Sequence, residues 1–329
     1  MRARPANARR NGSTSLMWLA ALWLAMLCGA AAAAAPVSVL RVQDAIGPAS
    51  ADYIVRGLKR AQEAGAPLAI IELDTPGGLD GSMRQIIQAI LASPVPVATY
   101  VTPEGARAAS AGTYILYASH IAAMAPATTL GAATPVAIGM PGSEPPAKPA
   151  SAPQDGKPAG DAMAAKRVND AAAFIRGLAQ QRGRNAEWAE RAVREAVSLT
   201  AEEALKQRVV DVVASSVLDL LAQVEGRTLR TPAGEVQLAT RGAAHELHAP
   251  GWRHRLLSVI ANPSFALILM TIGIYGLMFE FSSPGFGVAG VVGAICLLLA
   301  MFALQLLPIN YAGLALVLLG IALLAAEIV

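Results

Sequence analysis

The sequence predicts an α/β domain followed by an α-helical membrane domain, and three observations lead to this fold class. Short apolar runs of strand length alternate with amphipathic stretches through the first two thirds of the chain. Residues 256–326 contain a single charged side chain, Glu280. The 329-residue chain is 54% hydrophobic and only 15% charged, whereas soluble domains carry about 25% charged residues. Part of the chain therefore lies in lipid.

Residues 1–35 are predicted to be a secretory signal peptide. Four arginines precede the apolar run Leu16–Leu27, and the small-residue tract Gly29–Ala35 offers cleavage sites. We expect the following domain to be extracytoplasmic, and periplasmic in a Gram-negative cell; an uncleaved anchor is the alternative. Removing this segment takes away four of the 26 basic residues and none of the 23 acidic ones. The remaining 22 basic residues against 23 acidic ones give nucleic-acid binding no electrostatic basis.

Residues 36–245 are predicted to form the α/β domain. The expected strands are 37–42, 68–73, 95–101, 121–124 and 209–213, and the expected helices are 49–64, 79–92, 161–181 and 186–196. Alternation of this kind favours parallel β-α units. Thr200-Ala-Glu-Glu begins one more helix with the pattern of a capping box, and residues 228–238 have the pattern of a hairpin.

Two further segments depart from this alternation. Residues 139–160 are rich in Pro, Gly, Ala and Ser without apolar periodicity, so we predict a flexible loop. The apolar runs Ser264–Phe279, Val288–Leu307 and Ala312–Val329 have the length of membrane helices. Residues 255–329 are therefore predicted to form a multi-span membrane domain. The chain stops inside the third run, which we interpret as truncation.

Ser110 is the candidate nucleophile. It lies in Gly-Ala-Arg-Ala-Ala-Ser-Ala-Gly-Thr-Tyr, between a predicted strand and a short helix, and its small neighbours leave the hydroxyl accessible. The N-terminus of a helix offers unpaired amides and a positive dipole end to a developing oxyanion. The two glycines of Pro76-Gly77-Gly78 allow other amides to point at a ligand. Taken separately, Ser110 could be a mere N-cap and Gly77-Gly78 an ordinary turn.

A serine nucleophile needs a base, and the sequence offers no histidine at a convincing position. His120 begins a predicted strand, where a packing role is typical, and the other three histidines fall at the end of the domain. Lys166 follows Ala162–Ala165, small side chains that could pack around an amine, and burial favours a neutral lysine. The two lysines of the 139–160 loop would stay solvated. Lys166 could also be a solvated helix charge.

Several motifs together resemble the NfeD family of membrane proteases. They occur in the family's order and are Asp74–Gly78, Ala108–Ile115, Met124–Pro126, Gly131–Pro135 and Leu178–Asn185. The resemblance covers about residues 37–215 and the membrane part, and it implies a ClpP/crotonase-like fold with a Ser-Lys dyad.

On this match the residues take definite roles. Ser110 is the nucleophile, Lys166 is the base, and Gly77 or Gly78 together with Ala111 donate the oxyanion-hole amides. No metal or other cofactor is expected. The resemblance further implies apolar peptide segments as substrates, a stomatin-like membrane protein as partner and a homo-oligomer of at least two chains. The family's long form continues into an OB-type domain, which we expect to be missing from this chain.

Three other functions are alternatives to a membrane-anchored serine endopeptidase. A signal-peptide-peptidase-like protease would use the same dyad, but the multi-span tail argues against it. A non-catalytic membrane scaffold of the same fold would not need Ser110, Lys166 and Gly77-Gly78 intact. An acyl-CoA enzyme of the crotonase type is disfavoured because export separates the domain from its substrates.

Overall fold

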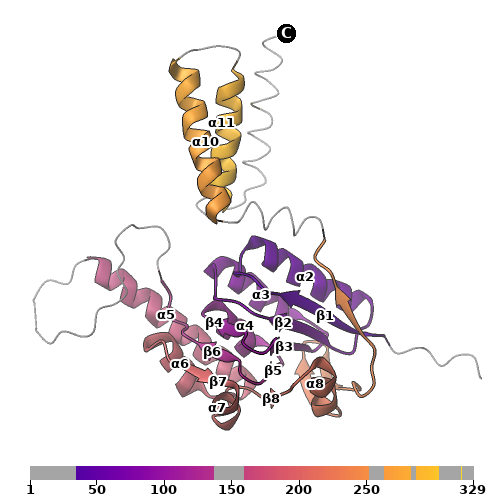
Figure 1. Cartoon of the computed structure of the whole chain (residues 1–329). Coiled ribbons are helices and arrows are strands. Elements are labelled where there is room, and N and C mark those ends of the chain that lie inside the picture. Colours follow the sequence, from indigo (N-terminus) through magenta and orange to yellow (C-terminus); the bar gives the residue numbers. More distant parts are fainter. Residues whose placement is uncertain (1–34, 137–158, 252–262, 283–286, 304–319, 321–329) are drawn as a thin grey trace, which may run out of the picture. The chain divides into compact units, whose positions relative to one another are not determined.

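The computed structural model of the chain describes residues 35–136, 159–251, 263–282, 287–303 and 320 (Figure 1). The predicted signal peptide up to residue 34 and almost all of the third apolar run lie outside the described residues, as do residues 139–158 of the predicted loop. The last two residues of that loop belong to helix α5, which begins at Ala159. That end of the predicted loop is therefore helical.

The α/β domain is built on a six-stranded, fully parallel sheet. Its strands, in spatial order, are β11 (His245–His248), β1 (Val37–Val42), β2 (Ala69–Leu73), β3 (Val97–Val101), β5 (Ile121–Met124) and β8 (Val212–Val213). Figure 1 shows β1, β2, β3 and β5 side by side. The strands predicted at β1, β2, β3 and β5 are confirmed, whereas only the last two residues of the strand predicted at 209–213 are extended, as β8. Strand β11 extends the sheet to His248, beyond the predicted end of the domain at 245.

Both faces of this sheet are covered, which explains why the central strands are apolar without interruption. All five residues of β2 and of β3 are buried. Alternate side chains enter two separate cores: Ile71 packs in the larger one and Ile70 in the smaller one. Such runs are characteristic of parallel strands that are buried on both faces.

Helices from both halves of the domain contribute to these cores. The larger core holds residues of α2 (Pro48–Glu63), α3 (Asp80–Ala92), α4 (Ala111–Ala118), α5 (Ala159–Arg182) and α6 (Ala186–Arg194). The smaller core holds residues of α8 (Val217–Val224). The predicted helices are confirmed within two residues at each end. The capping box is confirmed at α7 (Ala201–Lys206), and the hairpin is formed by β9 (Thr228–Thr231) and β10 (Gly234–Gln237).

A small second sheet carries the segment around Ser110. Strand β4 (Arg107–Ala109) pairs in parallel with β6 (Thr129–Gly131), which pairs antiparallel with β7 (Ser198–Thr200). These three-residue strands lack a sequence pattern long enough to predict. Their effect is to end β4 directly before Ser110 and to fix the backbone on both sides of it.

The apolar tail forms two described helices, α10 (Pro263–Ser282) and α11 (Val288–Ala303). They approach closely at glycines: a Cβ on Gly273 would lie 3.0 Å from the Gly293 carbonyl oxygen, as small residues permit in membrane hairpins. Within the described residues, only the window Phe265–Ser282 is both long and apolar enough to cross a bilayer, with a mean hydropathy of 1.8.

Candidate active site

Ser110 lies at the junction between β4 and α4, and its backbone is held in a conformation that L-residues rarely adopt. Its φ is 50° and its ψ is −115°, an arrangement that costs about 1–3 kcal/mol. Its amide donates to the Gly131 carbonyl oxygen over 3.0 Å, so β6 helps to hold it there. Strain of this kind persists only where the surrounding structure enforces it.

The Ser110 hydroxyl does not cap α4. No side-chain hydrogen bond caps this helix, and among the described residues no partner is found for the hydroxyl of the half-buried Ser110. Ser110 is thus the N-cap residue by position, but its side chain makes no capping hydrogen bond. Glycine is required at the neighbouring position 112 for a separate steric reason, because a Cβ on Gly112 would lie 2.7 Å from the Thr75 methyl carbon.

The Gly77-Gly78 loop approaches the same serine. A Cβ on Gly77 would lie 2.6 Å from the Cβ of Ser110 and 3.1 Å from its hydroxyl oxygen, and Gly77 has a φ of 118°. A Cβ on Gly78 would lie 2.1 Å from the Ile46 carbonyl oxygen. Only glycine fits at either position, so this loop is more than an ordinary turn.

The two glycine amides differ in what they bind. The Gly77 amide donates to the Thr75 hydroxyl oxygen over 3.2 Å. Within the described part of the chain, the amides of Gly78 and Ala111 have no acceptor. Ala111 is the first residue of α4, where helix geometry leaves the amide unpaired. Gly78 and Ala111 are therefore the two donors available beside Ser110.

These groups line one cavity of about 320 Å³. Its walls come from α3, α4, α5 and residues 133–136, and its larger apolar side chains are Met83, Tyr114, Val136 and Phe174. The rings of Tyr114 and Phe174 stack with their centroids 6.1 Å apart, which joins α4 to α5. The Tyr114 hydroxyl donates to the Ala133 carbonyl oxygen, and burial raises the pKa of this phenol. Tyr114 is thus a neutral part of the wall.

Lys166 lies on α5, and no hydrogen bond joins it to Ser110 within the described residues. The lysine and the preceding residues Ala162–Ala165 are exposed, so the expected enclosure of the amine is absent. The next residue, Arg167, lines the cavity. Among the residues that the structure describes, Lys166 makes no hydrogen bond or ion pair. Its contact with Ser110 remains a prediction.

Family models match both halves of the chain. "NfeD1b, N-terminal domain" matches residues 36–232, and "NfeD integral membrane domain" matches residues 264–329. The chain belongs to the NfeD family. The resemblance noted in the motifs is thereby confirmed.

Two curated relatives of this NfeD chain are informative. It is 37% identical over 294 residues to the membrane-bound protease PH1510 of Pyrococcus horikoshii, covering 88% of this chain and 63% of the relative. It is 29% identical over 267 residues to the membrane protein NfeD1b of Bacillus subtilis, covering 81% of this chain and 55% of the relative. The chain thus spans less than two thirds of either relative's length.

Solved structures agree with these relatives. The NfeD chain resembles 1510-N, described as a membrane-bound stomatin-specific protease, in a lysine-to-alanine variant with a substrate peptide. That match has a TM-score of 0.59 and 37% identity and covers 68% of this chain and 97% of the other. A serine-to-alanine variant of 1510-N gives a TM-score of 0.57 at 37% identity, covering 66% and 98%. The α/β domain therefore has the fold of a protease domain.

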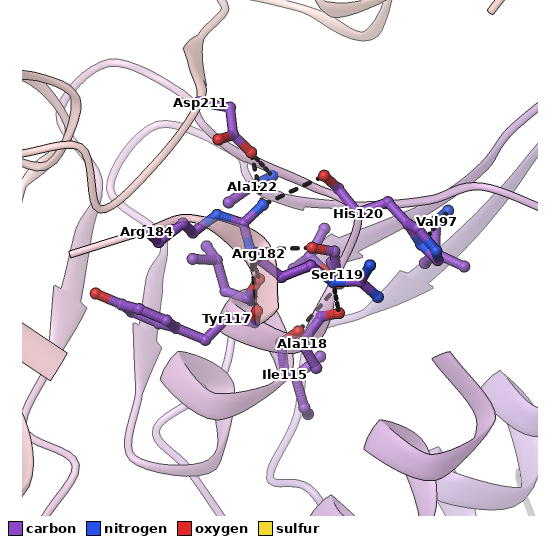
Figure 2. A network of polar contacts seen from close by, with 12 residues as sticks. Val97, Ile115, Tyr117, Ala118, Ser119, His120, Ala122, Arg182, Arg184 and Asp211 are labelled. Carbon is purple, nitrogen blue, oxygen red and sulfur yellow. Dashed lines mark hydrogen bonds and ion pairs between the residues drawn. The ribbon is translucent and has the colours of Figure 1, made fainter. Parts of the chain in front are cut away.

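The far end of α4 in the NfeD chain carries a buried polar network that the sequence did not suggest (Figure 2). The Arg184 side chain is only 2% exposed and pairs with Asp211 over 2.6 Å. It also donates to the carbonyl oxygens of Leu116, Tyr117 and Ser119. The end of a helix leaves such carbonyls without a full set of helical donors, and within the described residues only the Leu116 carbonyl of these three also accepts a backbone amide, that of Ser119. Arg184 lies in the motif Leu178–Asn185, but no spacing in the sequence connects it to α4.

His120 belongs to this far end. Its Nδ1 accepts a hydrogen bond from the Val97 amide over 3.2 Å. Burial, with a smaller contribution from Arg182 and Arg184, lowers the pKa of His120 to about 3. Since α4 has eight residues, it separates His120 from Ser110 by roughly 12 Å. A packing role, as the sequence predicted, fits this position. No group of three His, Cys, Asp or Glu side chains that could hold a metal is found within the described ranges.

Proposed function

We propose that this chain is a membrane-anchored serine endopeptidase of the ClpP/crotonase-like class. The observation that carries the proposal is the unpaired Ser110 hydroxyl, which lies on a strained junction beside the free amides of Gly78 and Ala111. Donors preorganised around a developing oxyanion are commonly the largest single contribution to acyl-transfer catalysis. Two relatives, the protease PH1510 and the serine-to-alanine variant of 1510-N, support the same function.

Lys166 is the general base in this proposal. The lysine-to-alanine variant of 1510-N that was solved with a substrate peptide supports a lysine in the reaction. Lys166 is on α5, whose next residues line the cavity beside Ser110. His120 is a poor candidate because its Nδ1 is occupied and it lies at the other end of α4.

The reaction follows from these roles. The neutral Lys166 amine takes the proton of Ser110 while the Oγ forms a bond to the peptide carbonyl carbon. The amides of Gly78 and Ala111 donate to the resulting oxyanion. Protonated Lys166 then gives its proton to the leaving nitrogen as the peptide bond breaks. A water deprotonated by Lys166 hydrolyses the acyl-enzyme and releases Ser110.

The cavity and the relatives together suggest the substrate. Aromatic and aliphatic side chains make up most of its larger lining residues, and such a wall favours an apolar side chain beside the scissile bond. One solved relative is described as specific for a stomatin homologue. We therefore propose apolar segments of a stomatin-like membrane protein as substrates.

The proposed setting is a bilayer, with the protease domain outside the cytoplasm. The match to an integral membrane domain and the apolar helix α10 support membrane insertion. Helix α11 and the further apolar run at 312–329 support more than one span. The extracytoplasmic location rests on the predicted signal peptide.

A homo-oligomer of at least two chains is part of the same proposal. Met163 is 61% exposed on α5, and the alanines around it are exposed as well. A second copy of the chain or a bound substrate would cover this apolar surface directly before Lys166. Covering it would remove water from the Lys166 amine and so favour the neutral form that a general base requires.

Covalent labelling tests the proposal in the full-length protein in detergent. A fluorophosphonate should modify wild type at Ser110, and Ser110→Ala should abolish both labelling and peptide hydrolysis. Lys166→Ala should lose nearly as much activity as Ser110→Ala, and the double variant little more, because the two residues act as one unit. Hydrolysis by Lys166→Ala at the wild-type rate would exclude the dyad, and wild-type hydrolysis by Ser110→Ala would exclude the nucleophile.

A further inference from the structure

Arg84 on α3 is an arginine at the cavity wall whose partners come from two helices. Its Nε donates to Asp80, one turn earlier on α3, over 2.9 Å. Its Nη2 donates to Asp170 on α5 over 2.8 Å. Its guanidinium lies 4.5 Å from the ring centroid of Phe174, also on α5. One side chain thus ties α5 to α3 by an ion pair and a cation–π contact.

The link joins two helices that each position part of the proposed site. Helix α3 begins two residues after Gly78, which offers one of the two free amides beside Ser110. Asp170 follows Lys166 by four residues on α5, so the two side chains share one face of the helix. A link at Asp170 therefore fixes the face from which Lys166 projects.

The residues before Asp170 have few other contacts. Residues 162–167 of α5 are all exposed, and Val168 is the first that packs against the larger core. Asn169 accepts a hydrogen bond from Arg194, which joins α5 to α6. Within the described residues, the Arg84–Asp170 pair is thus the polar link nearest to Lys166 along α5 that joins this helix to α3, beside Gly78.

We propose that Arg84 is a positioning residue that holds α5 so that Lys166 can reach Ser110. The proposal rests on the dyad advanced above. Arg84 is 37% and Asp170 is 70% exposed, so each contact is individually weak, as exposed ion pairs and cation–π contacts are. The contacts act together on one helix, and a small displacement of a base is costly to a proton transfer that needs hydrogen-bonding distance.

The test compares Arg84→Ala, Asp170→Asn and their combination in the full-length protein. Each single variant should lower kcat for peptide hydrolysis and the rate of fluorophosphonate labelling by about two- to tenfold, with KM changing less. The double variant should be no slower than the slower single one, because both remove the same link. As a matched control, Glu195→Gln removes an exposed ion pair with Arg191 at the C-terminal end of α6 and should leave both rates within about twofold.

Other outcomes would overturn the proposal. If Arg84 contacted the substrate instead, Arg84→Ala would raise KM while Asp170→Asn left kcat and labelling unchanged. If Asp170 acted only through its charge on Lys166, the two variants would move the midpoint of the pH–rate profile in opposite directions, since one removes a cation and the other an anion. Wild-type rates in both variants, with Lys166→Ala inactive, would reject the link and keep the dyad. An active Lys166→Ala would instead reject the dyad.

Discussion

The two ends of helix α4 are built in opposite ways. At its start, Ser110 is half-buried and strained, and neither its hydroxyl nor the Ala111 amide has a partner within the described residues. At its end, the buried Arg184 satisfies the carbonyls of the last turn and pairs with Asp211. The start is left open for chemistry, whereas the end is closed by hydrogen bonds.

This difference follows from the backbone of a short helix. Both ends of a helix leave polar groups without helical partners. The free amides at the start attract negative charge, and the carbonyls at the end attract positive charge. A catalytic oxyanion can bind the free amides at the start only if no protein group accepts from them. The carbonyls at the end need hydrogen-bond donors, because α4 is buried throughout and unpaired buried polar groups are destabilising.

The largest expected effect is at the start of α4. Ser110→Gly removes the nucleophile and should lower activity by about 10⁴-fold or more. Glycine adopts the φ of 50° found here without steric cost, so we expect the free energy of unfolding to rise by about 1 kcal/mol.

Peptide hydrolysis and chemical denaturation measure the two effects of Ser110→Gly. Ser110→Ala is the matched control, because it removes the same hydroxyl and keeps the strain. A stability gain in Ser110→Ala equal to that in Ser110→Gly would show that the backbone at this residue is not strained.

At the C-terminal end of α4, a substitution should lower stability and leave activity nearly unchanged, the opposite of what is expected at Ser110. Arg184→Met removes the charge partner of Asp211, which keeps only the Ala122 amide among the described residues, and leaves the carbonyls of Tyr117 and Ser119 without a donor. The free energy of unfolding should therefore fall by about 3 kcal/mol. Activity per folded molecule should change far less than in Ser110→Gly. Denaturation curves with activity measured on the folded fraction separate the two.

Two comparisons sharpen the Arg184 prediction. Arg191→Met removes an exposed arginine of α6 and should cost no more than about 0.5 kcal/mol. Adding Asp211→Leu to Arg184→Met should recover only part of the loss, since the carbonyls of Tyr117 and Ser119 stay unpaired and the Ala122 amide loses its side-chain acceptor. Full recovery would mean that the ion pair, and not the closing of the helix end, accounts for the stability.

The last effect is absent at neutral pH and concerns His120, whose pKa lies near 3 in the folded chain against about 6.5 in an unfolded one. The unfolded chain takes up a proton first, so the contribution of His120 to stability is complete above about pH 6.5 and is lost as the pH falls from there towards 3. His120→Gln should flatten that part of the stability curve. Parallel curves for both proteins from pH 7 to pH 4 would contradict the lowered pKa.

Much of the architecture could be predicted because it depends on local pattern. The strands β1, β2, β3 and β5 and the helices α2, α3, α5 and α6 follow apolar periodicity, and Thr200 is recognisable by its capping box. The strands β4, β6 and β7 were missed because three residues carry too little pattern. Strand β11 was missed because an exposed edge strand of His-Glu-Leu-His has no apolar alternation.

The sequence by itself determined that a serine among small residues precedes a short helix, that a double glycine follows a buried strand, and that the tail is apolar enough for lipid. These are properties of neighbouring residues. Only the tertiary structure decided that Gly77 touches Ser110 while its amide is taken by Thr75. It alone brought Arg184 to the end of α4 and Arg84 to α5. Such contacts join residues far apart in the chain, and packing of the whole domain, not any local pattern, selects them.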